Sequence, residues 1–359
     1  MDIFVAGSDF KPDFLIESYE TFIWTDRFAA YGDFKLVVKE AYYLGNLRFF
    51  KYLVTSSSNR VMMIESISIP KEEDGESLIT ISGRSIEAFL LTRSSKNGNL
   101  SNKEPEAFNG NLGDIATYIV EKYCVKASLA GAVNVIPGLS IAPSTLGQNV
   151  SIGVARGPVY DMVKSVCDAG KLGFMVFRSG GSLIFTVYEG IDKSLPSTQY
   201  YRMYSSDTET FINTSSIESI ANYKNHARVL GVKTGVDVYS PGTPSTVSGL
   251  DRRTLIIEAS DIGSSTTETD PAKQTTIAQD QAWLTQRGLD HLNLPANKYV
   301  NLVDGDIPPA DWNDVYFGMG DIVMVKDSKG IKNKMRITEQ IWSIDSEGEQ
   351  YMPTFTYVG

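Results

Sequence analysis

Val61–Ile69 has the sequence VMMIESISI, in which polar and apolar side chains partly alternate before Pro70 ends the run. A charged segment follows at residues 71–76, and Leu78–Ser82 (LITIS) then returns with the composition of a second strand. Two such runs joined by a charged turn that contains glycine are typical of a β-hairpin. The pattern therefore predicts one long strand over residues 61–69 that pairs with the returning strand.

Strand patterns continue on both sides of this hairpin. Phe34–Val38 follows a Tyr-Gly-Asp turn signal, and Arg228–Val232, Arg253–Glu258 and Asp321–Val325 have strand character further along the chain. The 359 residues include 18 Tyr, 16 Phe and 30 Gly, which favours many short strands and tight turns. The sequence therefore predicts a mainly β protein.

The middle of the chain has a helical period instead. Asn111 is expected to cap a helix that reaches Tyr123, and Gly157–Gly170 is expected to form a second helix with Pro158 in its first turn. A hairpin over Phe174–Tyr188, with its turn at Ser179–Ser182, should follow. Together these elements predict a small α+β domain.

A chain of this length is long enough for two or three domains. We predict a β domain at residues 1–95, the α+β domain at 96–198, and a second β domain at 199–359. A helical insertion is expected in the third domain at about 265–297, where Asp270-Pro271 begins a helical pattern. Gly263–Thr267 is expected to be a flexible linker before it.

The charge balance excludes a tight nucleic-acid binder. The formal net charge is −10, and no run of Lys or Arg exceeds two residues. Proteins that bind nucleic acid tightly carry a basic patch that neutralises phosphates. The N-terminus has no basic region of a signal peptide, and no stretch approaches the ~20 apolar residues of a membrane span. We expect a chain that first folds in a cytoplasm, with Cys124 and Cys167 as buried thiols rather than a disulfide.

Signals of catalysis are weak. The two histidines, His226 and His291, are expected to be surface or half-buried residues, and no nucleophile elbow, P-loop, dinucleotide-binding glycine motif or Cys-x-x-Cys is present. Carboxylate pairs that would suit glycoside hydrolysis exist, but 43 acidic residues produce such pairs by chance. The two pairs considered are Glu65 with Glu87 and Asp161 with Asp168.

One acidic segment, Asp304–Asp321, concentrates oxygen ligands of the kind that hard cations prefer. It lacks the spacing of a calcium loop, and Pro308-Pro309 interrupts it, so a solvated loop is the better interpretation. We therefore predict no catalytic residue, no cofactor and no metal site, and we interpret the protein as a non-enzyme.

Four segments resemble a known family when their order and spacing are taken together. They are Phe22–Phe28 (FIWTDRF) with Gly32–Leu36, Ile64–Ile67 with Ile81–Ser85, Tyr188–Ser194 (YEGIDKS) with Asn222–Asn225, and Gly320–Val323 before Pro353–Phe355. On these segments the chain resembles the tail hub (baseplate hub) proteins of tailed bacteriophages, of the siphophage type.

The resemblance points to a set of interface or structural residues: Trp24, Arg27, Gly83, Arg84, Asp192, Gly320 and Asp321. Trp24 is expected in the core because large aromatic residues bury well, and the two glycines are expected where strands begin or end sharply. For Arg84, as for Arg93, an ion pair across an interface and an intrachain or solvated pair remain equally open.

The resemblance also implies that the β domains at residues 1–95 and 199–359 are β-barrel-like and that copies of the chain assemble. The expected protein is a homotrimeric ring at the virion tail tip, which closes or continues the tail tube and gives passage to the tape-measure protein and DNA. Its expected partners are copies of itself, the distal tail protein ring, the tape-measure protein and other tail-tip or receptor-binding proteins. The chain stops at Gly359, so cell-wall hydrolysis and host recognition are expected to come from those other proteins.

Two other functions remain open on the sequence. The 18 Tyr are compatible with a carbohydrate-binding tail adhesin, although tyrosine is also common in ordinary strands. A cell-wall hydrolase would need a carboxylate pair or a nucleophile in a cleft.

Overall fold

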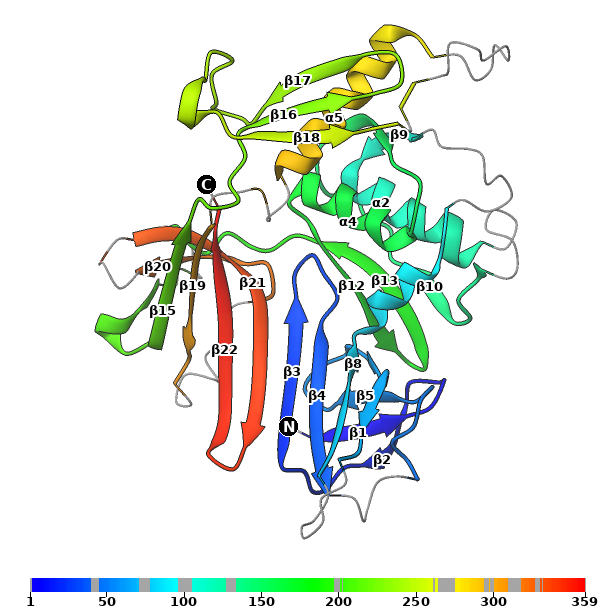
Figure 1. Ribbon diagram of the computed structural model, residues 1–359. Coiled ribbons are helices and arrows are strands. Elements are labelled where there is room, and N and C mark those ends of the chain that lie inside the picture. The colour runs from blue at the N-terminus through cyan, green and yellow to red at the C-terminus, as the bar shows by residue number, and fades with distance from the viewer. Residues whose placement is uncertain are drawn as a thin grey trace.

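In the computed structural model the chain is mainly β with a few helices, which confirms the predicted fold class (Figure 1). The structure describes residues 2–39, 45–70, 78–95, 105–126, 134–196, 201, 203–260, 262–263, 275–293, 297, 300–308, 318–326, 330 and 332–358.

The largest sheet in the described chain has ten strands, drawn from both ends of the sequence. Its main path runs β15 (Ile212–Ser219), β19 (Val300–Asp306), β22 (Gly348–Tyr357), β21 (Lys332–Asp345), β3 (Thr21–Arg27), β4 (Asp33–Lys39), β8 (Leu78–Arg84) and β7 (Ser66–Ser68). β20 (Ile322–Lys326) pairs with β21, and β14 (Met203–Ser205) pairs with β20. The antiparallel β3–β21 pair is therefore the connection between the N-terminal and C-terminal strands (Figure 1).

The predicted hairpin is present, with one correction. β7 pairs with β8 as expected, and the charged turn at 71–76 lies outside the described residues. The single strand predicted over 61–69 is wrong, because it is divided into β6 (Met62–Met63) and β7. The division occurs because β6 pairs with β5 (Tyr52–Thr55) in a different sheet, whose order is β2-β1-β5-β6. The two further strands of that sheet are β1 (Ile3–Ala6) and β2 (Pro12–Leu15).

The two helices and the hairpin predicted for the α+β region are present, together with three strands that were not predicted. This region contains the helices α2 (Leu112–Val120) and α4 (Val159–Gly170), and α2 continues into a short π-helical turn at Glu121–Val125. Its strands are β9 (Glu106–Asn111), β10 (Leu139–Ile141), β11 (Asn149–Val154), β12 (Gly173–Ser179) and β13 (Ser182–Tyr188). Asn111 and Pro158 occupy the positions before the two helices. Cys124 and Cys167 are buried free thiols, as expected.

A separate three-stranded sheet carries the predicted helix. The strands are β17 (Gly235–Tyr239), β16 (His226–Leu230) and β18 (Thr254–Glu258), and α5 (Ile277–Asn293) packs on them. Leu284 and Leu292 of the helix join Val229 in a core of their own. The predicted start of the helix, and most of the predicted linker, lie outside the described residues.

Short 3-10 helices complete the described elements at Ile86–Thr92, Ser206–Thr208 and Gly249–Asp251. Among the described residues, no helix has the length and apolar character needed to span a membrane. The predicted domain limits, and the likeness of two barrel-like domains, stay predictions.

Candidate functional site

The predicted site residues Trp24 and Arg27 lie on β3, where it meets β21. Trp24 is 3% exposed and stands in register with Trp342 of β21 and with Phe34 of β4. Arg27 bonds through Nε to Glu339 of β21 at 2.5 Å and also pairs with Asp33 of β4. Burial lowers the pKa of the Arg27 guanidinium, but the two carboxylates outweigh that effect and raise it. The FIWTDRF motif thus links the N-terminal strands to the C-terminal strands.

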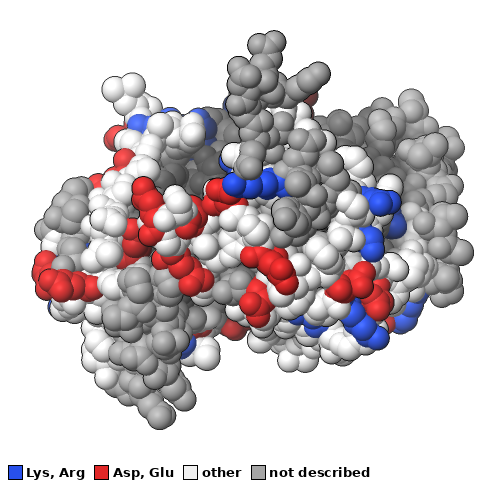
Figure 2. Space-filling view, turned by 90° about the horizontal axis from the view of Figure 1, so that it is seen from below, with Lys and Arg blue, Asp and Glu red and all other residues white. Residues whose placement is uncertain are grey.

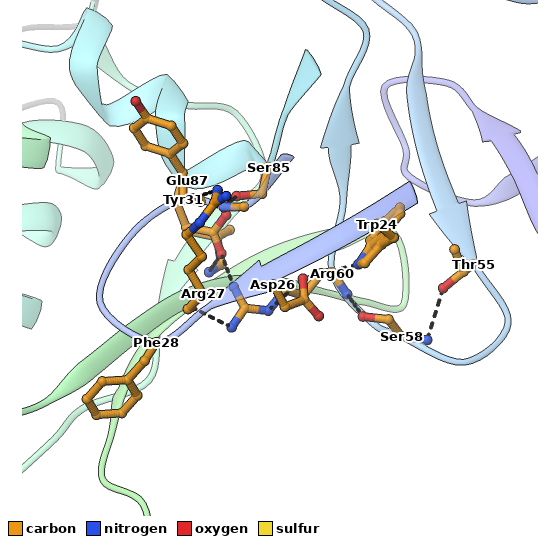
Figure 3. Close-up of polar contacts among 12 residues, drawn as sticks. Trp24, Asp26, Arg27, Phe28, Tyr31, Thr55, Ser58, Arg60, Ser85 and Glu87 are labelled. Carbon is orange, nitrogen blue, oxygen red and sulfur yellow. Dashed lines mark hydrogen bonds and ion pairs between the residues drawn. The ribbon is translucent and has the colours of Figure 1, made fainter. Parts of the chain in front are cut away.

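A buried ion network lies beside this contact (Figure 3). The Arg60 side chain is 5% exposed; its Nη1 lies 3.3 Å from Glu87 Oε1, and its Nε lies 3.6 Å from Asp26 Oδ1. Glu87 is fully buried and also accepts a hydrogen bond from the Val176 backbone N–H at 2.8 Å. Nη2 of the arginine bonds to the Tyr188 hydroxyl at 3.5 Å. The network therefore holds the N-terminal strands against the α+β hairpin.

The electrostatics of the network follow from its burial. Burial raises the pKa of Asp26, and the nearby Arg60 only partly offsets this. Burial lowers the pKa of Arg60 itself, but Asp26 and Glu87 outweigh it, so the net shift is upward. Burial also raises the pKa of Tyr188 to about 12. A buried charge is costly unless it is paired, so removal of any member leaves an uncompensated group.

Gly83 and Arg84 lie at the end of β8. A Cβ at position 83 would fall 1.8 Å from the Met63 carbonyl oxygen, so the backbones approach each other as closely as glycine allows. Arg84 makes a two-pronged bond to Glu65, both contacts at 2.7 Å, on the exposed side of the hairpin. Of the alternatives left open for Arg84, the structure shows the intrachain pair.

The remaining predicted residues meet at one place, where Gly190–Ser194 crosses Gly318–Ile322; we call it the 190/320 junction. Asp321 accepts hydrogen bonds from the backbone N–H of Ile191 at 2.7 Å and of Gly318 at 2.6 Å. It also pairs with Lys193 at 2.6 Å. Two segments far apart in the sequence are thereby joined by one carboxylate.

Asp192 supports the same junction from the other side. It forms a parallel bridge with Ile322, and its carboxylate bonds to Lys334 at 2.6 Å and to the Ser194 hydroxyl at 2.6 Å. Burial acts to raise the pKa of Asp192, but the bonds from Lys334 and Ser194 outweigh it, so the pKa is lowered.

Phe28 is the residue that brings these contacts together, and the sequence did not single it out. A Cβ on Gly320, whose φ is +90°, would fall 2.2 Å from the Phe28 ring, and a Cβ on Gly173 would fall 2.5 Å from it. The ring meets Tyr188 edge-to-face at 5.4 Å and lies under the Arg336 guanidinium at 4.8 Å. Phe28 thus contacts both the α+β region and the C-terminal strands.

The sequence also missed the role of Arg60 and Glu87. The sequence contained a signal of a buried ion pair, because Arg60 directly precedes the apolar run VMMI, and a charged residue next to a buried strand needs a partner. The suggested carboxylate pair of Glu65 and Glu87 is not supported, since each binds a different arginine.

The second suggested pair, Asp161 and Asp168, lines a cleft of about 480 Å³ between α4 and α5. Asp168 bonds to Lys164 at 3.0 Å, and Asp290 of α5 faces the same cleft. Burial, with a contribution from Asp168, raises the pKa of Asp290 to about 6. Burial also raises the pKa of Asp161.

The expectation that His226 is at the surface or half-buried is wrong, because it is fully buried. Its Nδ1 lies 3.0 Å from the Thr254 hydroxyl, and its Nε2 lies 2.9 Å from Arg252 and 3.2 Å from Asp237. Burial and Arg252 lower its pKa. The Arg252 guanidinium opposes protonation of the imidazole, which argues against a role for His226 as a general base. The contacts with Thr254, Arg252 and Asp237 account for the burial of the ring within the sheet.

No group of three His, Cys, Asp or Glu that would hold a metal ion is found in the described part of the chain. The expectation of a solvated loop over Asp304–Asp321 is wrong for its described residues, because Asp304 and Asp306 belong to β19 and Asp321 is buried, while residues 309–317 lie outside the described part. The predicted site residues make structural contacts at three places, which are Trp24 and Arg27 on β3, Gly83 and Arg84 on β8, and the 190/320 junction.

A family model described as Siphovirus ReqiPepy6 Gp37-like protein matches residues 3–355. The chain belongs to this family. The match includes β3, both sides of the 190/320 junction and the strands that join them, and it confirms the expected resemblance to a siphophage tail protein. No curated protein matches the chain.

Solved structures of tail proteins share the fold. The tail protein from Neisseria meningitidis MC58 has a TM-score of 0.56 and 15% identity, and the match covers 100% of this chain and 96% of that chain. The 43 kDa tail protein of prophage MuSo2 from Shewanella oneidensis has a TM-score of 0.53 and 12% identity, with 99% and 98% covered. Prophage tail protein gp18 from Listeria monocytogenes EGD-e has a TM-score of 0.52 and 11% identity, with 99% and 94% covered. The family and the shared fold support a structural role in a phage tail.

Proposed function

We propose that the protein is a tail hub subunit, three copies of which form a ring at the siphophage tail tip. The ring closes or continues the tail tube and leaves passage for the tape-measure protein and DNA. The observation that carries the proposal is the β3–β21 pairing, which joins strands from both ends of the chain into one sheet. Such a sheet offers a continuous wall, and the ion network and the 190/320 junction hold it against the α+β region.

The end of that sheet offers a contact for a neighbouring copy. β15 is the last strand on its side of the described path, and its Ile217 is 51% exposed. An edge strand can pair with another chain, and a ring needs head-to-tail contacts that close. We assign the edge strand β15 to the contact between subunits.

Residues 1–95 and 199–359, without the insertion at about 265–297, are proposed as two similar domains around the ring axis. Three copies with two such domains each would present six near-equivalent positions to a six-fold distal tail protein ring. Superposition of the two domains in an experimental ring structure tests this point, and unrelated strand topologies would contradict it.

The charge of the chain suits a passage for DNA. The net charge is −10, and acidic side chains predominate among the charged ones on the face in Figure 2. Because phosphate contacts supply most non-specific affinity, we expect negligible DNA binding at physiological salt. Submicromolar binding that weakens with salt would contradict this part of the proposal.

The decisive experiment is cryo-electron microscopy of purified tails, in which we expect three copies of this chain at the tip. One copy per tail would refute the ring. A matched pair of variants tests the edge strand: Ile217→Lys should block incorporation into tails, because a charged residue on an edge strand opposes pairing. Ile256→Lys is the control, because Ile256 is 66% exposed on β18 of the separate three-stranded sheet. This variant should leave incorporation unchanged.

A further inference from the structure

An apolar cavity of about 220 Å³ lies between the N-terminal strands and the α+β region. Its wall includes Phe10, Tyr52, Phe89, Leu90 and Leu139. An empty apolar cavity of ~150 Å³ in a protein takes up benzene, so this one has room for a large apolar side chain. The cavity lies outside the β3 contacts and the 190/320 junction described above.

Arg93 lines the same cavity, and its guanidinium has no carboxylate partner among the residues that the structure describes. Its guanidinium lies 4.5 Å from the centre of the Phe89 ring. Nε donates to the Asn134 carbonyl oxygen at 3.0 Å, and Nη1 donates to the Thr92 hydroxyl at 3.0 Å, so both of these acceptors are neutral. Five other arginines of the described chain pair with carboxylates: Arg27, Arg60, Arg84, Arg156 and Arg228.

A second cleft, of about 370 Å³, adjoins the cavity through Phe10, which lines both. Lys11 and Arg178 line this cleft, and neither has an ion pair within the described residues. Arg178 Nη2 bonds to the Thr55 carbonyl oxygen, while its Nε is buried without a hydrogen-bond partner there. Within the described residues, Arg93 of the cavity and Lys11 and Arg178 of the adjoining cleft thus have no carboxylate partner, although the chain has a net charge of −10, and an anion would complete this arrangement.

The shared wall residue has an unusual backbone. Phe10 has a φ of +54°, in the left-handed region that bulky residues rarely adopt. A hydrogen bond from its N–H to the Gly7 carbonyl oxygen at 3.1 Å and an edge-to-face contact with Tyr52 at 4.8 Å hold it there. Strain of this kind persists where the surroundings fix it, and it gathers at binding sites.

We propose that the cavity and its adjoining cleft bind a peptide segment of a partner protein in which a bulky apolar residue stands next to acidic ones. The apolar side chain fills the cavity beside Phe89 and Leu90. The flanking carboxylates bond to Arg93 on one side of Phe10 and to both Lys11 and Arg178 on the other. This inference does not depend on the ring geometry proposed above.

The test uses three short synthetic peptides with the purified full chain. Acetyl-Glu-Phe-Glu-amide carries both features, acetyl-Gln-Phe-Gln-amide lacks the charges, and acetyl-Glu-Ala-Glu-amide lacks the apolar anchor. Affinities are measured by competition against the first peptide made with 4-fluorophenylalanine, observed by fluorine NMR. We expect the first peptide to bind at least tenfold more tightly than either control. Equal affinities for all three, or no detectable binding at millimolar peptide, would overturn the proposal.

Variants locate the site. Arg93→Gln and, in a separate variant, Lys11→Gln should each lower the affinity for the acidic Phe peptide several-fold and leave the affinity for the Gln peptide unchanged. Lys35→Gln is the control, because Lys35 is an exposed residue of β4 away from the cavity and its loss changes the net charge equally. An equal loss in all three variants would show a non-specific charge effect and refute the site. Tighter binding of 3-phenylpropionate than of the acidic peptide would refute a peptide as the occupant.

Discussion

Replacement of Asp290 by asparagine is expected to stabilise the contact between α4 and α5 at neutral pH. Asp290 lines the cleft between the two helices, where burial and Asp168 raise its pKa to about 6. An unfolded aspartate has a pKa of about 3.9, so the folded state binds the proton more tightly than the unfolded state does. The contact is therefore most stable below about pH 4 and loses stability as the pH rises through 6.

The size of the effect follows from the shift. A difference of about two pKa units corresponds to about 3 kcal/mol, which is an upper limit because the cleft is open to solvent. Asparagine carries no charge and retains the acceptor for Gln286 Nε2, which bonds to Asp290 Oδ1 at 2.8 Å. We expect Asp290→Asn to add about 1–2 kcal/mol at pH 7.5 and nothing at pH 4.

Other charged groups face Asp290 across the cleft, and they set the background of the measurement. They are Arg156, Asp161, Lys164, Asp168, Arg287 and His291. Hydrogen exchange of the α5 amides, corrected for the intrinsic pH dependence of exchange, measures the local stability. Asp251→Asn, at an exposed carboxylate, is the control and should change nothing. Equal protection of α5 in wild type at pH 4.5 and 7.5, or lower protection in Asp290→Asn, would refute the reasoning.

Three further predictions concern stability and reactivity. Arg60→Met should lower the free energy of unfolding by about 3–5 kcal/mol in urea titrations, because it leaves buried carboxylates unpaired. Arg84→Met, which removes an ion pair at the surface, should lower it by less than about 1 kcal/mol. Equal losses in the two variants would contradict the buried network. Gly83→Ala should lower the free energy of unfolding, measured by thermal unfolding, by several kcal/mol, because its Cβ would meet the Met63 carbonyl oxygen. Gly45→Ala should leave it unchanged, because no atom lies within 4 Å of a Cβ at position 45. Burial raises the pKa of the Cys124 thiol to about 12. The thiol should therefore not react with a thiol reagent at pH 8 until the protein unfolds. Rapid labelling of the folded chain would contradict this prediction.

Much of the local structure was predictable from the sequence because its causes are local. The period of apolar residues fixed the two helices of the α+β region, and Gly180-Gly181 allowed the tight turn between β12 and β13, both with positive φ. The long strand predicted from Val61 was wrong because strand pairing, which depends on distant partners, divides it between two sheets.

The sequence by itself determined the fold class, the buried thiols, the strand and helix patterns, and the motifs that match the family, because composition and residue order carry these. Only the tertiary structure decided what the motif residues do. Trp24 faces Trp342, 318 positions later in the chain, and Arg60 lies between carboxylates that belong to other elements. Contacts of this kind depend on which strands pair across the sheet, and no local pattern of residues encodes that choice.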